Sequence, residues 1–291
     1  MKDVVFLTSK AKSNLASSVV RSKQLSALYS LLRPELNVHY HEVSRGVSER
    51  KLGRINIVNK AFMTNFPARS LPPETPTRRF ILDSVDAKIR PEYVPRLSGL
   101  ISTNFTEVKA MGALYPGKLI FYVPLHPNLE VAGFAAQGHD FRIGYFGETF
   151  NCRYLPELVA RCGVEVVTTP TNRQVGSWAR RFTDFPAHIS FRRYRLSDGR
   201  KPFTKGIFAA LSGAVYVGDA VPEAKYLLGE DYPFFAKGDS LDDAVAVIET
   251  ARENFGNTYW DIARSRMENV ARESSVQRVL WHLDQVVDHF L

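Results

Sequence analysis

The sequence predicts an α/β protein built from two doubly wound parallel sheets. Short apolar runs rich in β-branched residues recur along the 291 residues, and segments with helical spacing separate them. Such runs are typical of parallel strands that are buried on both faces and joined by crossover helices. The expected strands form an N-terminal set, Val4–Thr8, Asn37–Tyr40, Ile55–Val58, Phe80–Leu82, Leu100–Ser102 and Leu119–Val123, and a C-terminal set, Phe141–Phe146, Val164–Thr168, Ala187–Phe191, Ala214–Val217 and Pro233–Phe235.

Helix start and stop signals lie between and after the runs of the C-terminal set. In the segment Pro222–Gly229, Pro222 can occupy the first turn of a helix and Gly229 can end that helix. Asp239 or Ser240 is expected to cap the next helix. Ser274 and Gln277 have the spacing of a capping box. The residues behind them keep helical apolar spacing to the end of the chain, so we expect this last helix to pack its apolar stripe on a domain.

The domain boundary is expected between His126 and Asp140, where Pro and Gly occur without a strong period. The expected parts are therefore an N-terminal domain at 1–130, a C-terminal domain at 131–273 and a docking helix at 274–291. Two doubly wound sheets that face each other place the carboxyl ends of their strands across a shared cleft, where such folds bind ligands.

The composition, 45% apolar and 23% charged, is that of a soluble globular protein. The early apolar run Val4–Leu7 is too short for a membrane span or a signal peptide, so we expect a cytoplasmic protein. The two cysteines, Cys152 and Cys162, stand apart from any clustered His and make no zinc pattern.

The formal net charge of +8 comes from basic residues scattered along the chain. No zinc finger, RNP sequence or long basic tail accompanies them, so we expect no nucleic-acid partner. A cleft for a phosphate-rich ligand or an attraction to anionic lipid fits the charge better. Neither a GxGxxG after the first strand nor a Walker sequence is present, which argues against ordinary NAD and ATP sites.

A basic loop followed by a helix of small and apolar residues precedes one of the C-terminal strands. The loop contains Lys201, Thr204 and Lys205, and a short helix is expected to follow it. The first turn of a helix presents unpaired amides and the positive end of the helix dipole, so this segment favours a diphosphate. A solvated basic turn before an ordinary helix is the alternative interpretation.

This segment resembles the donor-binding region of GT-B glycosyltransferases, in particular the bacterial families 4 and 1. In such proteins a lysine of a "KP..K" segment contacts the donor diphosphate, which implies donor-binding roles for Lys201, Thr204 and Lys205. The stretch Pro222–Gly229 is similar to the one that follows in those proteins. The resemblance implies that Glu223 accepts hydrogen bonds from the ribose hydroxyls of the donor.

Two further segments share the resemblance. Ile143–Glu148 is similar to the first strand and glycine loop of a GT-B C-terminal domain, where Gly147 would let the backbone approach the donor phosphate. After the run Ala187–Phe191, the resemblance places a basic residue at the phosphates: Arg192, with Arg193 as the alternate. Strand alternation turns only one of the two toward the cleft, and a solvated strand end is the other interpretation.

In the N-terminal half, two carboxylates carry the resemblance to these glycosyltransferases. Asp83 and Asp86 resemble a "D..DA" pattern at a strand end, so either is a candidate to position the acceptor or to act as general base. A helix cap at Asp83 or Ser84 with a solvated Asp86 is the alternative. Ser102, at the end of the next strand, and His126, near the domain crossing, are further cleft candidates, although a lone His near a linker also suits a structural role.

The resemblance implies a hexosyl or related transfer from a nucleoside-diphosphate sugar to a hydroxyl of a glycan or lipid-linked acceptor, as in polysaccharide biosynthesis. Lys205 and Arg192 would stabilise the leaving diphosphate. We expect no metal and no cofactor besides the co-substrate, since GT-B enzymes generally need none and no Asp-x-Asp motif is present. The basic charge also suits a peripheral contact with the inner face of the membrane.

One departure from the family keeps two other functions open. Many retaining members carry two glutamates eight positions apart, and the corresponding places here hold Phe208 and Arg200. A non-catalytic binding module with the GT-B fold is therefore an alternative. A nucleotide-sugar epimerase of the same fold is another, although the sequence shows no convincing acid–base set for it.

Overall fold

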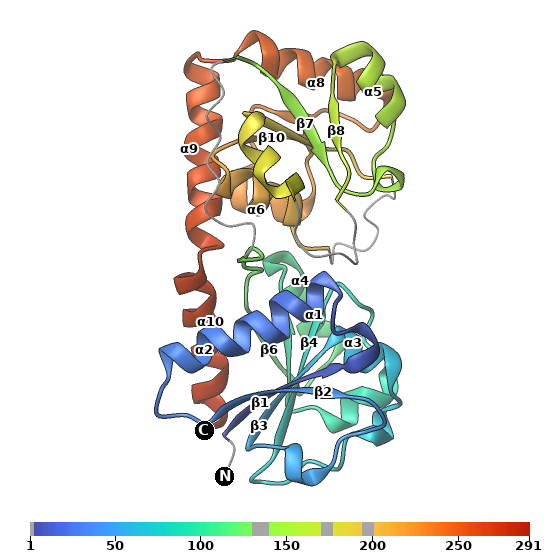
Figure 1. Cartoon of the computed structure of the whole chain (residues 1–291), viewed down its shortest axis with the longest axis vertical. Helices are drawn as coiled ribbons and strands as arrows, with labels where there is room; N and C mark the ends of the chain where they lie inside the picture. Colours follow the sequence, from blue (N-terminus) through green and yellow to red (C-terminus); the bar gives the residue numbers. More distant parts are fainter. Residues whose placement is uncertain (1–2, 130–139, 170–176, 194–200) are drawn as a thin grey trace. The chain divides into compact units, whose positions relative to one another are not determined.

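The computed structural model describes residues 3–129, 140–169, 177–193 and 201–291 (Figure 1). The chain divides into two compact units. The first comprises Met1–Leu129, Arg200–Pro202 and Val276–Leu291, and the second comprises Glu130–Gly199 and Phe203–Ser275. Most of the segment expected to be the linker lies outside the described residues.

The first unit holds a six-stranded sheet in the order β2-β1-β3-β4-β5-β6, and its neighbouring strands are parallel. The strands are β1 (Val4–Ser9), β2 (Val38–Val43), β3 (Ile55–Asn59), β4 (Arg79–Val85), β5 (Gly99–Ser102) and β6 (Leu119–Tyr122). Because β2 and β3 lie on opposite sides of β1, the winding reverses there. Such a reversal is the topological switch point of a doubly wound sheet, where ligands bind at the carboxyl ends of the strands.

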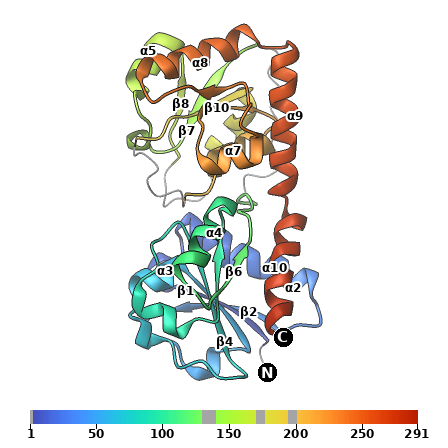
Figure 2. The same cartoon turned by 180° about the vertical axis from the view of Figure 1, so that it is seen from behind.

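Helices cover both faces of this sheet (Figures 1 and 2). Successive residues of a strand point to opposite faces, so Val4 and Phe6 enter one core cluster while Val5 and Leu7 enter the other. The helices of the unit are α1 (Ala16–Ser18), α2 (Leu25–Leu32), α3 (Lys60–Asn65), α4 (Phe105–Leu114) and α10 (Val276–Phe290). α2 and α10 pack on one face, and α3 and α4 pack on the other.

The expected docking helix is confirmed as α10. Its apolar stripe is buried against the sheet of the first unit, and Tyr29 of α2 donates a hydrogen bond to Asp284 Oδ1 at 2.7 Å. The predicted capping box was wrong. Ser274 instead ends α9 (Thr258–Glu273), because its N–H donates back to Val270 O, and α10 begins only at Val276.

The second unit holds a five-stranded parallel sheet in the order β11-β10-β9-β7-β8. Its strands are β7 (Ile143–Phe146), β8 (Glu165–Val167), β9 (Ala187–Ser190), β10 (Val215–Asp219) and β11 (Phe235–Ala236), and its helices are α5 (Leu155–Cys162), α6 (Thr204–Leu211), α7 (Pro222–Leu228), α8 (Leu241–Glu253) and α9. Here the winding reverses between β7 and β9. The predicted α/β class with two doubly wound sheets is confirmed.

Most helix signals of the second unit act as the sequence predicts. α7 begins at Pro222, and Gly229 follows it with a positive φ of 89°. Ser240 caps α8 and forms a capping box with Asp243. In the part of the chain that the structure describes, no helix has both the length and the apolar composition needed to cross a membrane.

Candidate functional site

Predicted site residues lie along the carboxyl edge of the sheet in the second unit. Gly147 directly follows β7, and Arg192 lies two residues after β9. Lys205 is in the first turn of α6, and Glu223 is in the first turn of α7, which follows β10. The switch point of this sheet is between β7 and β9, so these side chains gather where a doubly wound sheet binds its ligand.

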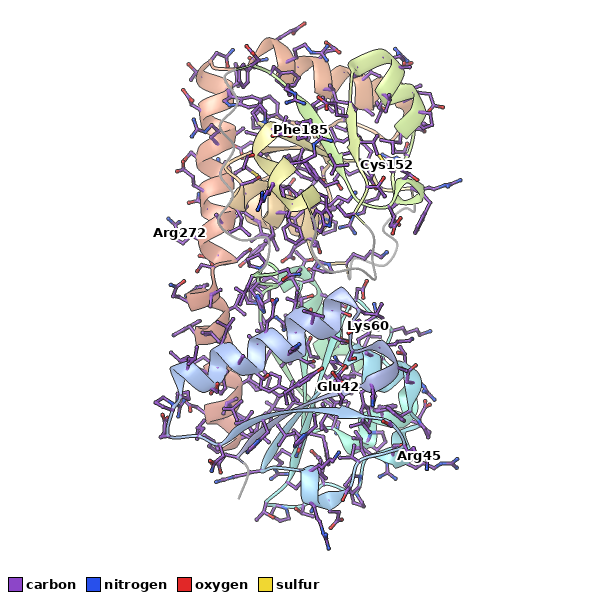
Figure 3. All side chains as sticks on the ribbon, viewed as in Figure 1. Glu42, Arg45, Lys60, Cys152, Phe185 and Arg272 are labelled. Atoms are coloured by element: carbon purple, nitrogen blue, oxygen red, sulfur yellow. The ribbon has the colours of Figure 1, made fainter. Side chains whose placement is uncertain are left out.

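The loop after β7 is fixed to the segment after β9. Cys152 and Arg192 form an isolated antiparallel bridge, and Arg153 N donates to Phe191 O at 2.9 Å. Figure 3 labels Cys152 in this loop. Burial raises the pKa of the Cys152 thiol to about 11, so the thiol is protonated at neutral pH and contributes shape rather than charge.

Asp219, the last residue of β10, accepts hydrogen bonds from both of these segments. Its Oδ2 accepts from Arg192 N at 2.7 Å, and its Oδ1 accepts from Arg153 Nη2 at 2.7 Å. Burial raises the pKa of Asp219, while the two arginines and the hydrogen bonds oppose that shift. Sequence reasoning did not single out Asp219 or Arg153. The available signal was a carboxylate at the end of a buried apolar run.

Lys205 is a partly buried cation beside an aromatic ring. Its Nζ lies 3.6 Å from the centroid of the Tyr145 ring, which is a cation–π arrangement. Among the residues that the structure describes, no carboxylate forms an ion pair with this amine. Burial lowers the pKa of Lys205 to about 7, and the nearby Arg192 guanidinium also lowers it. A bound anion would supply the missing negative charge.

Gly147 keeps space open beside that amine. Its φ is +147°, a conformation that residues with a side chain rarely adopt. A Cβ at this position would lie 3.1 Å from Lys205 Nζ and 3.2 Å from the Tyr145 hydroxyl. The absence of a side chain therefore allows the backbone and a ligand to come close to the ammonium.

The remaining predicted residues of this region have different places. Thr204 is the first residue of α6, and Glu223 is buried. Arg192 is partly buried whereas Arg193 is exposed, as strand alternation requires. Lys201 is exposed and belongs to the first unit, so it is not among the side chains that the second unit brings together. In the described part of the chain, no three His, Cys, Asp or Glu side chains gather as metal ligands would.

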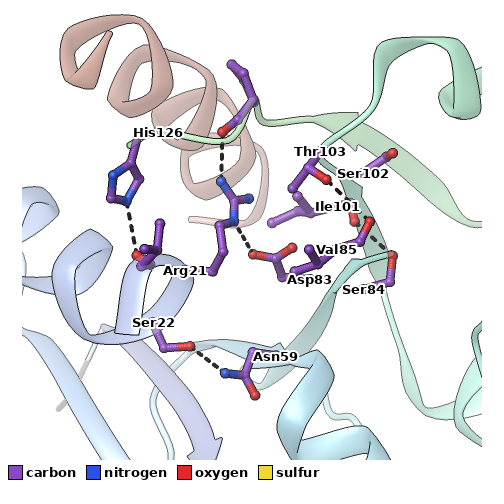
Figure 4. A network of polar contacts seen from close by, with 12 residues as sticks. Arg21, Ser22, Asn59, Asp83, Ser84, Val85, Ile101, Ser102, Thr103 and His126 are labelled. Carbon is purple, nitrogen blue, oxygen red and sulfur yellow. Dashed lines mark hydrogen bonds and ion pairs between the residues drawn. The ribbon is translucent and has the colours of Figure 1, made fainter. Parts of the chain in front are cut away.

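The two candidate carboxylates of the first unit have contrasting environments. The Asp83 side chain is 1% exposed, and its Oδ2 pairs with Nε of the fully buried Arg21 at 2.8 Å (Figure 4). The Asp86 side chain is 21% exposed and forms an ion pair with Lys60, which Figure 3 labels. Of the two, Asp86 is the one that a molecule from solvent can reach.

Ser102 and His126 are both buried and hydrogen-bonded to the backbone. Ser102 Oγ donates to Asn104 O at 2.9 Å and accepts from Asn104 N at 3.1 Å. His126 Nε2 lies 3.0 Å from Val20 O, and its Nδ1 lies 2.6 Å from Pro127 O. Burial lowers the pKa of His126 to about 4, so the ring is neutral and can donate to only one of these carbonyls. Both side chains hold local structure in the first unit.

No protein-family model and no curated protein matches this chain in sequence. Solved structures do match its fold. HepE from Anabaena, solved in complex with UDP, is 11% identical with a TM-score of 0.64 over 99% of this chain and 100% of HepE. A glycosyltransferase from Rickettsia africae is 8% identical with a TM-score of 0.64 over 99% of this chain and 98% of that one.

Sucrose-phosphate synthase from Thermosynechococcus elongatus is similar in fold as well, with 10% identity and a TM-score of 0.63 over 99% of this chain and 98% of that one. All three are GT-B glycosyltransferases. The two Rossmann-like units of this chain match theirs. The chain therefore has the GT-B glycosyltransferase fold.

Proposed function

We propose that this chain is a glycosyltransferase that moves a sugar from a nucleoside-diphosphate sugar to a hydroxyl of a glycan or lipid-linked acceptor. The observation that carries the proposal is the Lys205 ammonium beside Gly147 at the switch point of the second unit. HepE, which has the same fold, was solved with UDP and with UDP and glucose. A diphosphate is an anion that a lysine, an arginine and the first turn of a helix can hold together.

Within this proposal, Lys205 and Arg192 hold the donor diphosphate and stabilise the negative charge that develops on it as the sugar leaves. Gly147 brings the backbone close to the phosphates. Glu223 accepts hydrogen bonds from the ribose hydroxyls, and Thr204 lies at the amide-rich first turn of α6. Lys205 is half-buried and partly desolvated, which strengthens its interaction with a phosphate relative to one in bulk water.

Asp86 is the better candidate for the general base. A base must reach the hydroxyl that it deprotonates, and Asp86 is partly exposed at the carboxyl edge of the first sheet. Asp83 is buried in its pair with Arg21, so we assign it a role through Asp86 rather than one at the substrate.

Thermal unfolding with a panel of nucleoside diphosphates and nucleotide sugars tests the donor site. We expect one nucleotide to raise the melting temperature, because a ligand at about 100 times its Kd stabilises the native state by about 2.7 kcal/mol. Lys205→Ala should lose that shift. Lys225→Ala removes a lysine of α7 that pairs with Glu230, and this variant should keep the shift. If no nucleotide shifts the melting temperature at millimolar concentration, the donor site is refuted.

A non-catalytic binding module is the second candidate, and one observation favours it. Phe208 occupies the place where many retaining GT-B enzymes carry a glutamate, and its ring stacks on Phe182 with centroids 5.7 Å apart. An aromatic cluster there supplies no acid or base. A protein that binds a nucleotide sugar tightly, but neither transfers nor hydrolyses the sugar, would fit this candidate and contradict the transferase.

A further inference from the structure

Arg21 is a fully buried arginine that the predicted site did not include. It lies in a π-helical turn, Val19–Gln24, between α1 and α2. Its Nε donates to Asp83 Oδ2 at 2.8 Å, and its Nη1 donates to Pro124 O at 2.8 Å (Figure 4). A single guanidinium thus joins the helix after β1 to the end of β4 and to the segment after β6. Insertions of the π type in helices frequently occur at functional sites.

The same π-helical turn holds the segment after β6 through further contacts. His126 Nε2 lies 3.0 Å from Val20 O. Gln24 Nε2 donates to Asn128 Oδ1 at 2.7 Å, and Gln24 Oε1 accepts from Leu129 N at 3.2 Å. His126 and Gln24 therefore hold the turn to the segment after β6, as Arg21 itself does through Pro124 O.

The chain after Asp83 adopts an unfavourable conformation before it reaches Asp86. Val85 is β-branched and has φ of +56°, and the pairing of β4 with β5 shifts register between Asp83 and Val85. Such a backbone costs about 1–3 kcal/mol and persists only where surrounding contacts impose it. Three contacts hold this turn: Ala87 N donates to Ser84 O at 2.9 Å, Thr103 Oγ1 donates to Val85 O at 3.3 Å, and Asp83 pairs with Arg21.

We infer that Arg21 and Asp83 are positioning residues for Asp86. The buried pair fixes the start of the strained turn, and the other end of that turn presents Asp86 to Lys60. This inference rests on the proposed function, in which Asp86 is the base. Figure 4 shows the pair in place beside Val85 and Thr103.

Stability alone gives little reason for this pair. Within the described residues, Arg21 Nη2 and Asp83 Oδ1 are buried without a hydrogen-bond partner. A buried ion pair with unmet hydrogen bonds is a poor stabiliser, and apolar side chains of similar volume often replace one without loss. Removing a single partner is different, because it leaves an uncompensated charge in the core. Removing both partners should therefore cost little stability, so a loss of activity in that variant would report positioning rather than structure.

The test compares single and double variants in the full chain. Arg21→Met and Asp83→Leu should each lower the melting temperature, and the double variant should recover most of the loss. If the pair positions Asp86, the double variant should still have kcat reduced by about tenfold or more at unchanged donor KM, and Asp86→Asn should show the same loss. Arg33 directly follows α2 in the same unit and pairs with Asp284 and Asp288 of α10, so Arg33→Met serves as the control and should keep kcat.

A second measurement does not depend on catalysis. Amide hydrogen exchange at residues 84–87 should be about tenfold faster in the double variant than in Arg33→Met, because the strained turn has lost its anchor. If the double variant does not fold, Arg21→Lys takes its place in the test. It keeps the charge and should retain part of the protection. A double variant with the kcat, pH profile and exchange of the wild type overturns the inference. If the wild type transfers no sugar although the amides of residues 84–87 are protected from exchange, the proposed function is refuted rather than the positioning role.

Discussion

The amine of Lys205 carries a charge that the fold stabilises weakly. Tyr145, Cys152 and Arg192 surround it, and none of them supplies a negative charge at neutral pH. Burial lowers its pKa from the ordinary value of 10.5 to about 7. A phosphate favours the protonated amine, so a bound diphosphate should raise that pKa again.

We therefore expect proton uptake when UDP or another nucleoside diphosphate binds at pH 8. The diphosphate is almost fully ionised at that pH, and the free amine has largely lost its proton, so the proton must come from the buffer. The apparent Kd should weaken by up to about tenfold per pH unit above pH 7. Calorimetric titration in two buffers of different ionisation enthalpy measures the uptake. A binding heat that does not depend on the buffer would contradict this assignment, and Lys205→Met should abolish any dependence.

Gly147 offers a second test at the scale of a single residue. Gly147→Ala should cost about 1–2 kcal/mol of stability because of its φ, and it should also weaken nucleotide binding because the new Cβ crowds Lys205 Nζ. Gly163→Ala is the matched control, since its φ is +68° but open space surrounds its Cβ position. Urea unfolding and nucleotide titration of both variants separate the two effects. Equal affinities in the two variants would show that the space at Gly147 is not used by a ligand.

Individual site residues could be predicted from the sequence only where a local motif marks them. Gly147 and Lys205 stand in recognisable segments, and the structure places Lys205 Nζ 3.1 Å from the position that a Cβ of residue 147 would take. Arg21 and Asp219 lie outside the motifs that carry the resemblance. Their roles arise from partners 62 and 27 positions away, Asp83 and the backbone of Arg192. Such partners become neighbours only through the fold of the sheet.

Strands were predictable at the scale of elements because burial on both faces leaves a continuous apolar run. β1 and β10 illustrate this, with five or more consecutive residues that are wholly or largely buried. The sequence does not predict α9 as a separate helix, and Ser274, which is the C-cap of α9, resembles a cap of the next helix. The π-helical turn at Val19–Gln24 has no local signal, because tertiary contacts of Arg21 and Gln24 hold it.

The packing of α10 predicts how the two faces of this helix respond to mutation. Leu283 is fully buried against the first sheet, whereas Trp281 is 49% exposed. Leu283→Ala should therefore lower the free energy of unfolding by about 2–5 kcal/mol, and Trp281→Ala should change it by much less. Urea unfolding of the two variants tests this. Similar losses in both would mean that α10 is not docked through its apolar stripe.

At the scale of the whole molecule, each unit has its own parallel sheet and its own switch point. The agreement with solved GT-B structures extends over 99% of the chain at 8–11% identity, so the fold is retained by the pattern of buried runs rather than by particular residues. The proposed transfer depends on a few side chains. Because the identity is only 8–11%, each of these residues must be tested by mutation.

We propose that the carboxyl edge of β7 and β9 binds a nucleoside diphosphate. Amide hydrogen exchange with and without the stabilising nucleotide tests it most directly, because it reports where in the chain the ligand acts. We predict protection at residues 147–153 and in the first turn of α6, and loss of that protection in Lys205→Ala. Nucleotide-dependent protection that lies elsewhere, or that survives in Lys205→Ala, would contradict the account.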